Sequence, residues 1–337
     1  MITIAIWMDI AICLFPDVIH GRTSIFSPNG TPAHSVFGLS TLVLTFALGI
    51  FLVVGGLLLY SLIRFRYRPS DPHASREPAQ IYGSTQIELS WTVIPILIVF
   101  MLFLATTRVI YSTEHAAKPS TALDIVVIGH QFWWEYRYPK FGIVTANELH
   151  IPVSDPRHPM PTYLTMSSAD TNHNFWIPQL AGKMDVIPNK VNTMWIDPAS
   201  AGLYLGQCAQ YCGTQHAKML LRVYADTPAD FAAWVANQRQ PASEDAATSE
   251  GRAIFQHNAC ISCHTIAGTV ATGRFGPDLT HIASRDTIAS GSVPNTPENI
   301  RKFVKSPDHF KPGVLMPPMH LSDHDVDAVT AYLMTLK

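Results

Sequence analysis

Two long stretches without a charged side chain limit the folds open to this chain more than any other feature. Residues 37–62 contain no Asp, Glu, Lys or Arg, and residues 89–107 are equally uncharged up to Arg108. A helix needs about 20 apolar residues to cross the hydrocarbon core of a membrane, and it satisfies its own backbone hydrogen bonds there. The sequence therefore predicts a transmembrane hairpin over residues 36–112.

The composition agrees with a chain that is partly embedded in lipid. Charged residues make up 14% of it, whereas an average soluble protein has about 25%. The connection between the two runs carries Arg64, Arg66, Arg68 and Arg76, and such basic loops face the cytoplasm. Both chain ends are therefore expected on the outer side, where residues 1–35 form either a signal segment or a periplasmic arm. A net charge of −2 without a basic cluster gives no reason to expect a nucleic-acid partner.

After the second run the amino-acid composition of the chain changes twice. Residues 121–225 form short β-rich runs broken by prolines and glycines, which predicts a β-sandwich or barrel within a domain of residues 121–236. Residues 237–250 are polar and small, as in a linker. The apolar residues of 251–337 recur at helical spacing, so an all-α domain is expected there.

The helical domain contains the sequence Cys260-Ile261-Ser262-Cys263-His264. In a C-x-x-C-H arrangement two thiols form thioethers with the haem vinyl groups and the histidine ligates the iron. A methionine opposite that histidine favours ferrous iron. Met316 is the expected second ligand, with Met319 as its rival. The motif predicts a covalently bound haem c, and electron transfer as the function.

A second cluster of soft ligands lies in the β-rich region. Cys208, Cys212, His216 and Met219 follow one another closely, and His173 precedes them. Thiolate, imidazole and thioether ligands suit copper, and the second cysteine points to two ions that share bridging thiolates. Three alternatives stay open: a tetrahedral zinc site without the methionine, a disulfide between the cysteines, and a methionine that only fills the core.

Together these features resemble subunit II of the haem–copper cytochrome c oxidases, in the bacterial form with a cytochrome c domain fused at its C-terminus. The resemblance runs from about residue 36 to residue 337. It includes the hairpin, the cysteine-rich loop, Gly129-His-Gln-Phe-Trp-Trp-Glu-Tyr136 and Gly182-Lys-Met-Asp-Val-Ile-Pro188. It implies a multi-domain membrane protein with a two-helix transmembrane hairpin, an all-β cupredoxin domain and an all-α class I cytochrome c domain.

The resemblance also implies a dinuclear copper centre, CuA, in the cupredoxin domain. Two bridging thiolates, one histidine for each copper, a weak thioether ligand and a backbone carbonyl would hold it, namely Cys208, Cys212, His173, His216, Met219 and Gln210. The family commonly has glutamate where Gln210 stands, and uses its carboxylate toward a magnesium or manganese ion. An amide is a poorer ligand for a hard cation, so that second ion is in doubt here.

Two further roles follow from the resemblance. Phe132, Trp133 and Trp134 match the aromatic patch through which electrons from cytochrome c reach the copper; ordinary strand packing is the alternative. Glu88 matches a glutamate at the mouth of a proton pathway. Its alternative is a charge that marks the end of the membrane helix.

The haem ligands implied are Cys260, Cys263, His264 and Met316, and the activity implied is that of a terminal oxidase subunit. Electrons would pass from a soluble or membrane cytochrome c to haem c, to CuA and to the haem of subunit I, where O2 is reduced to water with proton pumping. No catalytic residue is expected in this chain. Subunit I, subunit III and the lipid of the bacterial inner membrane are the other expected partners, with both cofactor domains on the periplasmic side.

Two other functions compete with this interpretation. A quinol oxidase subunit would receive electrons that bypass copper, which the intact cysteine pair argues against. A membrane-tethered cytochrome carrier would keep structural zinc in the β domain and pass electrons to other partners. Metal content separates all three.

Overall fold

The computed structural model describes residues 23–66, 80, 82–155, 157, 159–243, 245–309 and 311–337. The signal or arm expected in residues 1–35 lies outside the described residues as far as residue 22, and so do Arg68 and Arg76 of the basic connection. Contacts divide the chain into two compact units, one of them Ser35–Ala117 and the other the rest of the chain.

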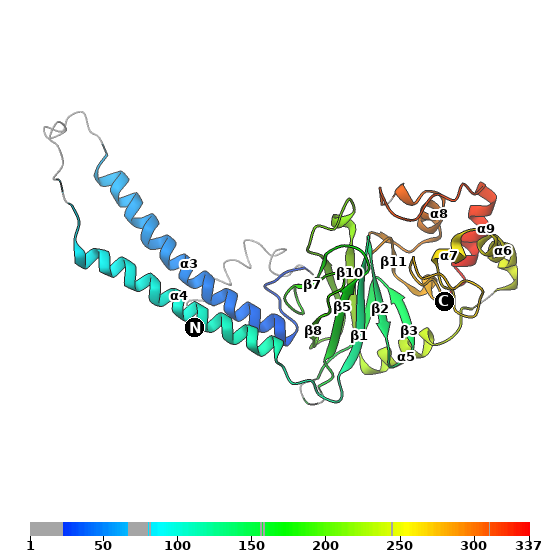
Figure 1. The fold of residues 1–337 in the computed structure, drawn as a ribbon, viewed down its shortest axis with the longest axis horizontal. Helices are drawn as coiled ribbons and strands as arrows, with labels where there is room; N and C mark the ends of the chain where they lie inside the picture. Colours follow the sequence, from blue (N-terminus) through cyan, green and yellow to red (C-terminus); the bar gives the residue numbers. More distant parts are fainter. Residues whose placement is uncertain are drawn as a thin grey trace. The chain divides into compact units, whose positions relative to one another are not determined.

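Two long helices form the first unit, α3 (Thr31–Arg64), whose first residues belong to the second unit, and α4 (Thr85–Glu114). They are the blue and cyan helices of Figure 1. Both are long and apolar enough to cross a membrane, which confirms the two apolar helices expected. Hydroxyl groups inside them bond back to the preceding turn, as Thr92 Oγ1 does to the Glu88 carbonyl at 2.8 Å, which gives these polar hydrogens a partner within the helix.

The β domain is a sandwich of two five-stranded sheets (Figure 1). The first sheet has, in order, β3 (Ile143–Ala146), β2 (Trp133–Tyr138), β1 (Leu123–His130), β5 (Thr162–Ser168) and β8 (Asn192–Ile196). The second has β4 (Glu148–Pro152), β10 (Leu220–Asp226), β9 (Gly202–Cys208), β6 (His173–Trp176) and β7 (Met184–Val186). β1 pairs with β5, and β4 with β10, in parallel; the other pairs are antiparallel.

Side chains that alternate along these strands fill the space between the sheets. In β5 and β10 every second residue is more deeply buried, as the two-residue period of a strand requires. Trp134, Tyr136 and Leu164 of the first sheet and Phe175 of the second are fully buried in one apolar cluster. Helix α5 (Pro228–Gln238) then closes the domain, with Phe231 in the same cluster.

The C-terminal domain is built from short helices: α6 (Ser249–His257), α7 (Cys260–Cys263), α8 (Pro297–Lys305) and α9 (Asp323–Leu333), with a small hairpin of β11 (Thr287–Ile288) and β12 (Val293–Pro294). Ser322 caps α9 by accepting from the amide of Asp325. α6 approaches α9 so closely that a Cβ at Gly251 would lie 2.0 Å from the Ala328 carbonyl. The predicted fold class, a helical hairpin followed by an all-β and an all-α domain, is confirmed.

Polar contacts tie the other parts of the second unit to the sandwich. Asn29 donates from its amide to the Gln179 carbonyl at 2.7 Å, and its own carbonyl accepts from Ala199. The C-terminal domain contacts the sandwich through Ser290 Oγ, which donates to the Leu220 carbonyl at 3.0 Å. The sandwich and the C-terminal domain are therefore in direct contact at Leu220, next to Met219.

Candidate cofactor sites

The cysteine-rich segment leaves the end of β9 and returns as β10. Cys208 is the last residue of β9, and a short 3-10 helix, η1 (His216–Lys218), forms the far side of the loop. The amide of Cys208 donates to the Met219 carbonyl at 2.9 Å, which closes the base of the loop. β6 pairs with β9 so that Phe175 lies opposite Cys208, and His173 at the start of β6 comes beside the thiols.

Four of the predicted copper ligands form a compact set. The sulfurs of Cys208 and Cys212 are 3.9 Å apart, and both cysteines are free thiols, since a disulfide bond measures ~2.05 Å. His173 Nδ1 lies 3.9 Å from the Cys208 sulfur, and His216 Nδ1 lies 3.7 Å from the Cys212 sulfur. Each histidine therefore contacts a different thiol.

The other two predicted ligands complete the set from opposite sides. The Met219 sulfur is fully buried and lies 3.8 Å from the Cys212 sulfur. The backbone carbonyl of Gln210 lies 3.2 Å from the Cys208 sulfur, and the Gln210 residue is exposed. The structure thus brings together all six residues that the sequence singled out for copper.

His173 is held in one orientation by its neighbours. Its Nε2 lies 2.8 Å from an oxygen of Asp170; because a carboxylate only accepts, Nε2 carries the proton and Nδ1 keeps a free lone pair. Burial raises the pKa of Asp170, but hydrogen bonds from His173 and from the amides of Thr171 and Gln131 together outweigh burial and hold that pKa below its usual value. A Cβ at Gly129 would lie 2.8 Å from the His173 ring, so glycine leaves the room that this orientation needs.

The two thiols have very different pKa values. The hydrogen bond between them lowers the pKa of Cys208 to about 3, and the same contact raises the pKa of Cys212. Cys208 therefore ionises first. A thiolate is the form of cysteine that binds metals.

The C-x-x-C-H motif occupies the single turn of α7 and the residue after it. His264 Nδ1 lies 2.8 Å from the carbonyl oxygen of Pro277, and because a carbonyl only accepts, Nδ1 is the protonated nitrogen and Nε2 is left free to bind a metal. A Cβ at Gly276 would lie 2.6 Å from the His264 ring. Pro277 and Gly276 together fix the imidazole of His264.

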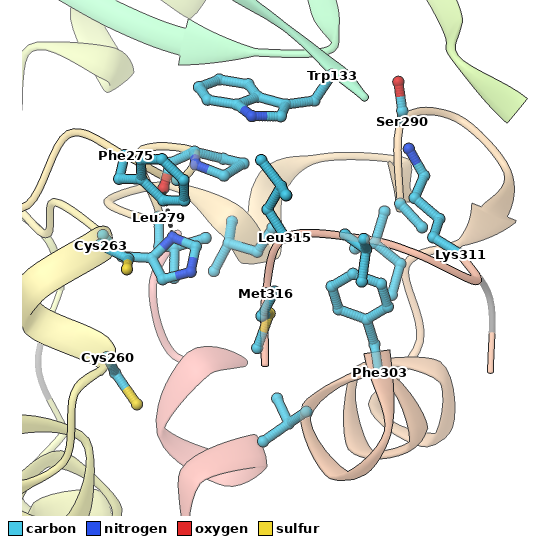
Figure 2. A pocket seen from close by; sticks show the side chains of 18 of the residues that line it. Trp133, Cys260, Cys263, Phe275, Leu279, Ser290, Phe303, Lys311, Leu315 and Met316 are labelled. Carbon is cyan, nitrogen blue, oxygen red and sulfur yellow. Dashed lines mark hydrogen bonds between the residues drawn. The ribbon is translucent and has the colours of Figure 1, made fainter. Parts of the chain in front are cut away.

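A cavity of about 470 Å³ opens beside this histidine. Volumes of 300–1,000 Å³ are usual for cofactor sites. Its lining is mainly apolar and includes Cys260, Cys263, Met316 and Met319. Figure 2 shows the two cysteines on one side of the cavity, Met316 near its middle and Trp133 above it. The four predicted haem ligands therefore line one cavity, and so does the rival Met319.

The three aromatic residues that the sequence singled out point to different places. Trp133 lines the cavity of the C-terminal domain and stacks on His130 with ring centroids 4.2 Å apart. Phe132 is buried and packs against the cysteine-rich loop, where a Cβ at Gly213 would come within 3.0 Å of its ring. Trp134 lies in the core, its ring centroid 5.9 Å from that of His173.

Two basic residues at the cavity were not anticipated from the sequence. Arg285 donates from Nη2 to the Asp278 carbonyl at 2.6 Å, and its buried Nε has no hydrogen-bond partner among the described residues. Lys311 is 2% exposed and donates from Nζ to the Phe132 carbonyl at 2.6 Å. Burial lowers the pKa of Lys311 to about 7. No sequence pattern distinguishes these residues from the surface Lys and Arg that are the rule in proteins.

Glu88 lies apart from both clusters. It stands in the first turn of α4 and is exposed. A Cβ at Gly83 would lie 2.5 Å from its carboxylate, so the side chain turns back over the residues before the helix. This position suits either of the two roles expected for Glu88.

Comparison with known families matches each part of the chain. Residues 24–109 match the transmembrane domain of cytochrome c oxidase subunit II, residues 156–225 its periplasmic domain, and residues 248–337 cytochrome c. The periplasmic-domain family implies copper, membership of subunit II implies a partnership with subunit I, and the cytochrome c family implies haem.

Curated relatives extend this likeness over most of the chain. Cytochrome c oxidase subunit 2 of Alkalihalophilus pseudofirmus is 31% identical over 317 residues, which are 92% of this chain and 90% of the relative. That of Bacillus sp. (strain PS3) is 32% identical over 81% of this chain and 80% of the relative. Quinol oxidase subunit 2 of Bacillus subtilis is 34% identical over 64% of this chain and 66% of the relative.

The cofactor clusters and the family matches lie in the same domains, the sulfur and histidine cluster in the sandwich and the C-x-x-C-H cavity at the C-terminus. The relatives cover the hairpin as well. The chain therefore belongs to the cytochrome c oxidase subunit II family, with a cytochrome c domain at its C-terminus, and is a membrane-bound part of an oxidoreductase complex.

Proposed function

We propose that this chain conducts electrons into a cytochrome c oxidase. It accepts them from a donor cytochrome c at its C-terminal domain, passes them to its sandwich domain, and delivers them to the haem of subunit I, where O2 is reduced to water with proton pumping. A covalent haem c and a dinuclear CuA centre would supply the one-electron chemistry in the two domains. The residues of this chain hold and orient these groups.

The contacts of the two histidines carry this proposal for the sandwich domain. One tetrahedral zinc ion needs four ligand atoms within about 2.3 Å of a single point, so each imidazole nitrogen would lie close to both sulfurs. Here His173 and the two sulfurs lie within 4.8 Å of one another, whereas His216 contacts the Cys212 sulfur and does not join that group. That division supports two ions bridged by two thiolates, with Met219 and the carbonyl of Gln210 as the outer ligands.

The donor set also favours copper over zinc by its chemistry. A thioether is a soft ligand that copper accepts and that structural zinc sites do not use. The Met219 sulfur is buried within 3.8 Å of the Cys212 sulfur, where it adds to the ligand set rather than to the apolar core alone. The hydrogen bond to Asp170 leaves Nδ1 of His173 as the nitrogen that would bind a metal.

The residues of the C-terminal cavity fit a haem. Cys260 and Cys263 are free thiols that can form thioethers with vinyl groups, and the proton on His264 Nδ1 leaves Nε2 for the iron. Met316 would supply the opposite ligand. The unpaired Nε of Arg285 in the cavity would hold a propionate, since a buried guanidinium needs an anion.

The orientation in the membrane follows from the charges between the helices. Arg64 ends α3, and Arg66 follows it. Because basic connections face the cytoplasm, both cofactor domains would lie on the periplasmic side of the bacterial inner membrane, where a donor cytochrome c can reach them. Subunit III is proposed as a further neighbour, and Glu88 as the mouth of a proton pathway.

Metal analysis and near-infrared absorption of the purified oxidase test the proposal. We expect two coppers in this chain for each covalent haem c, and the near-infrared band of a mixed-valence copper pair. Zinc in place of copper would contradict the oxidase role of the sandwich domain and favour a tethered cytochrome carrier. Haem without any metal in the sandwich domain would favour electron delivery that bypasses copper, as in a quinol oxidase.

A further inference from the structure

Lys311 is an unusual lysine because it is buried where two domains meet. It belongs to the segment of the cytochrome c domain that also carries Met316, and it lines the haem cavity. Figure 2 shows its side chain extending from that segment toward Ser290. Its Nζ donates to the Phe132 carbonyl of the sandwich domain at 2.6 Å. No carboxylate forms an ion pair with it among the residues that the structure describes.

The contact continues from Phe132 to the copper site. Phe132 shares a peptide group with Gln131, and Gln131 Nε2 donates to the carbonyl of Cys212 at 2.6 Å. The amide of Gln131 donates to Asp170 at 2.6 Å, which fixes the residue from its other side. Two hydrogen bonds and one stretch of backbone therefore join Lys311 to a copper ligand.

The cysteine-rich segment Cys208–Met219, here called the copper loop, also contacts the cytochrome c domain directly beside Lys311. Gln215 Nε2 donates to the carbonyl of Pro312 at 3.0 Å, and Thr214 Oγ1 donates to the same carbonyl at 3.4 Å. The loop that holds the copper ligands is thus fastened to the residue after Lys311. These contacts fix the positions of Lys311 and Cys212, which the hydrogen bonds of Phe132 and Gln131 connect.

We propose that Lys311 is a positioning residue that locks the cytochrome c domain onto the copper loop, and that the chain Lys311–Phe132–Gln131–Cys212 is the bonded path for electrons between the two sites. The inference rests on the proposed function. One electron would leave ferrous haem and reduce the oxidised copper pair, with no bond made or broken, and the external donor cytochrome c would restore ferrous haem.

Two physical reasons favour this path. Electrons tunnel more readily through covalent and hydrogen bonds than across gaps between atoms, and the path contains no such gap from Nζ to the copper ligand. In its charged form the buried amine of Lys311 also has two further N–H donors to satisfy besides the one that bonds Phe132. Lys311 lines the haem cavity, so a haem carboxylate there would accept these donors and the same amine would contact both partners.

The substitution Lys311→Met tests the inference in the complete oxidase with its cofactors. It keeps the length of the side chain and removes the charge and the hydrogen bond. We expect hydrogen–deuterium exchange of the amides around Phe132 and Pro312 to rise by about tenfold or more, as for the loss of one hydrogen bond from a charged donor. Transfer from photoreduced haem to copper should become slower than in the unmodified enzyme.

Lys305→Met is the matched control. Lys305 lies in the same domain, but it is half exposed and pairs with Asp323 on the surface. We expect the hydrogen–deuterium exchange and the rate of electron transfer from haem to copper in Lys305→Met to match those of the unmodified enzyme. A Lys311→Met enzyme that equals Lys305→Met in both measurements would overturn the inference.

Gln131→Met interrupts the same path on the copper side and leaves Lys311 unchanged. We expect slower transfer from haem to copper, unchanged exchange around Pro312 and an unchanged near-infrared copper band. An unaltered transfer rate in this variant would also count against the path. If the unmodified enzyme passes no electron from haem to copper, the proposed function fails. If the unmodified enzyme passes electrons and the Lys311→Met and Gln131→Met enzymes pass them equally fast, the further inference alone fails.

Discussion

The carboxylate of Glu148 accepts two hydrogen bonds from Thr287, one from its amide at 2.9 Å and one from its hydroxyl at 2.6 Å. Glu148 belongs to the sandwich domain and is only 4% exposed, and Thr287 belongs to the cytochrome c domain. The amide of Asp286 donates to the same carboxylate at 3.1 Å. One buried acid therefore satisfies three donors of the other domain.

Replacing Glu148 should loosen the joined domains. Glu148→Ala leaves three donors without an acceptor at a buried seam, and we expect the cytochrome c domain to lose about 2–4 kcal/mol of unfolding free energy, measured by urea denaturation. Glu250→Ala is the control, since Glu250 is exposed and lies 3.9 Å from His324; it should stay within about 0.5 kcal/mol of the parent. Equal losses in both variants would contradict the role of Glu148.

Removing the carboxylate that orients His173 should weaken copper binding without removing a ligand. In Asp170→Asn the amide can turn its NH2 group toward His173 Nε2, which no longer fixes Nδ1 as the free nitrogen. We expect copper affinity to fall about 10–100-fold, as for other partners of metal-bound histidines. Competition with a copper chelator measures it, and Asp155→Asn, in an exposed ion pair with Arg157, should leave the affinity as it was.

Local patterns were enough to predict much of this molecule. The uncharged runs gave two helices because a membrane helix satisfies its backbone within a single segment. The expected haem ligands Cys260, Cys263 and His264 are close in sequence, and a single helical turn holds the two cysteines. The copper loop is similar, since five of its six expected ligands lie between Cys208 and Met219.

Contacts between distant segments leave no such local pattern in the sequence. Lys311 and Phe132 are 179 positions apart, and Glu148 and Thr287 are 139 apart. A lysine or a glutamate outside a periodic run is usually an exposed residue, so only the fold indicates that these two are buried. Arg285 was missed for the same reason. The separate positions of Phe132, Trp133 and Trp134 likewise depend on the strand pairing around them.

The ion pairs of Glu135 should make the stability of the fold depend on pH. Burial raises the pKa of Glu135, but hydrogen bonds from His130 and Arg137 outweigh it, so the folded pKa lies below the ordinary value of 4.5. A lowered carboxyl pKa adds stability above the unfolded value, and this stability disappears as pH falls through the folded value. Glu135→Gln should therefore be less stable than the parent at neutral pH.

The difference between the two proteins should shrink as pH falls below 4.5, because the parent carboxylate then takes up a proton. Thermal unfolding across this range measures it. Glu298→Gln serves as control, since Glu298 pairs with Lys302 on an exposed helix face, where solvent screens the charges. A constant difference at every pH would refute the assignment to Glu135.

Met316 and Met319 both line the haem cavity, and substitution can decide between them as the iron ligand. A thioether opposite histidine stabilises ferrous iron and raises the potential. Met316→Leu should therefore lower the haem potential and remove the far-red sulfur-to-iron absorption band. It should also slow electron delivery from cytochrome c and leave the near-infrared copper band intact.

Met319→Leu is the matched substitution three residues away, and it should keep the potential and the far-red band of the parent. The opposite pattern would assign the iron to Met319. Oxidase turnover from an external cytochrome c gives the functional half of this test. If Met316→Leu lost its far-red band but turned over at the parent's rate, electrons would reach copper without the haem, and the cytochrome c domain would lie off the main route.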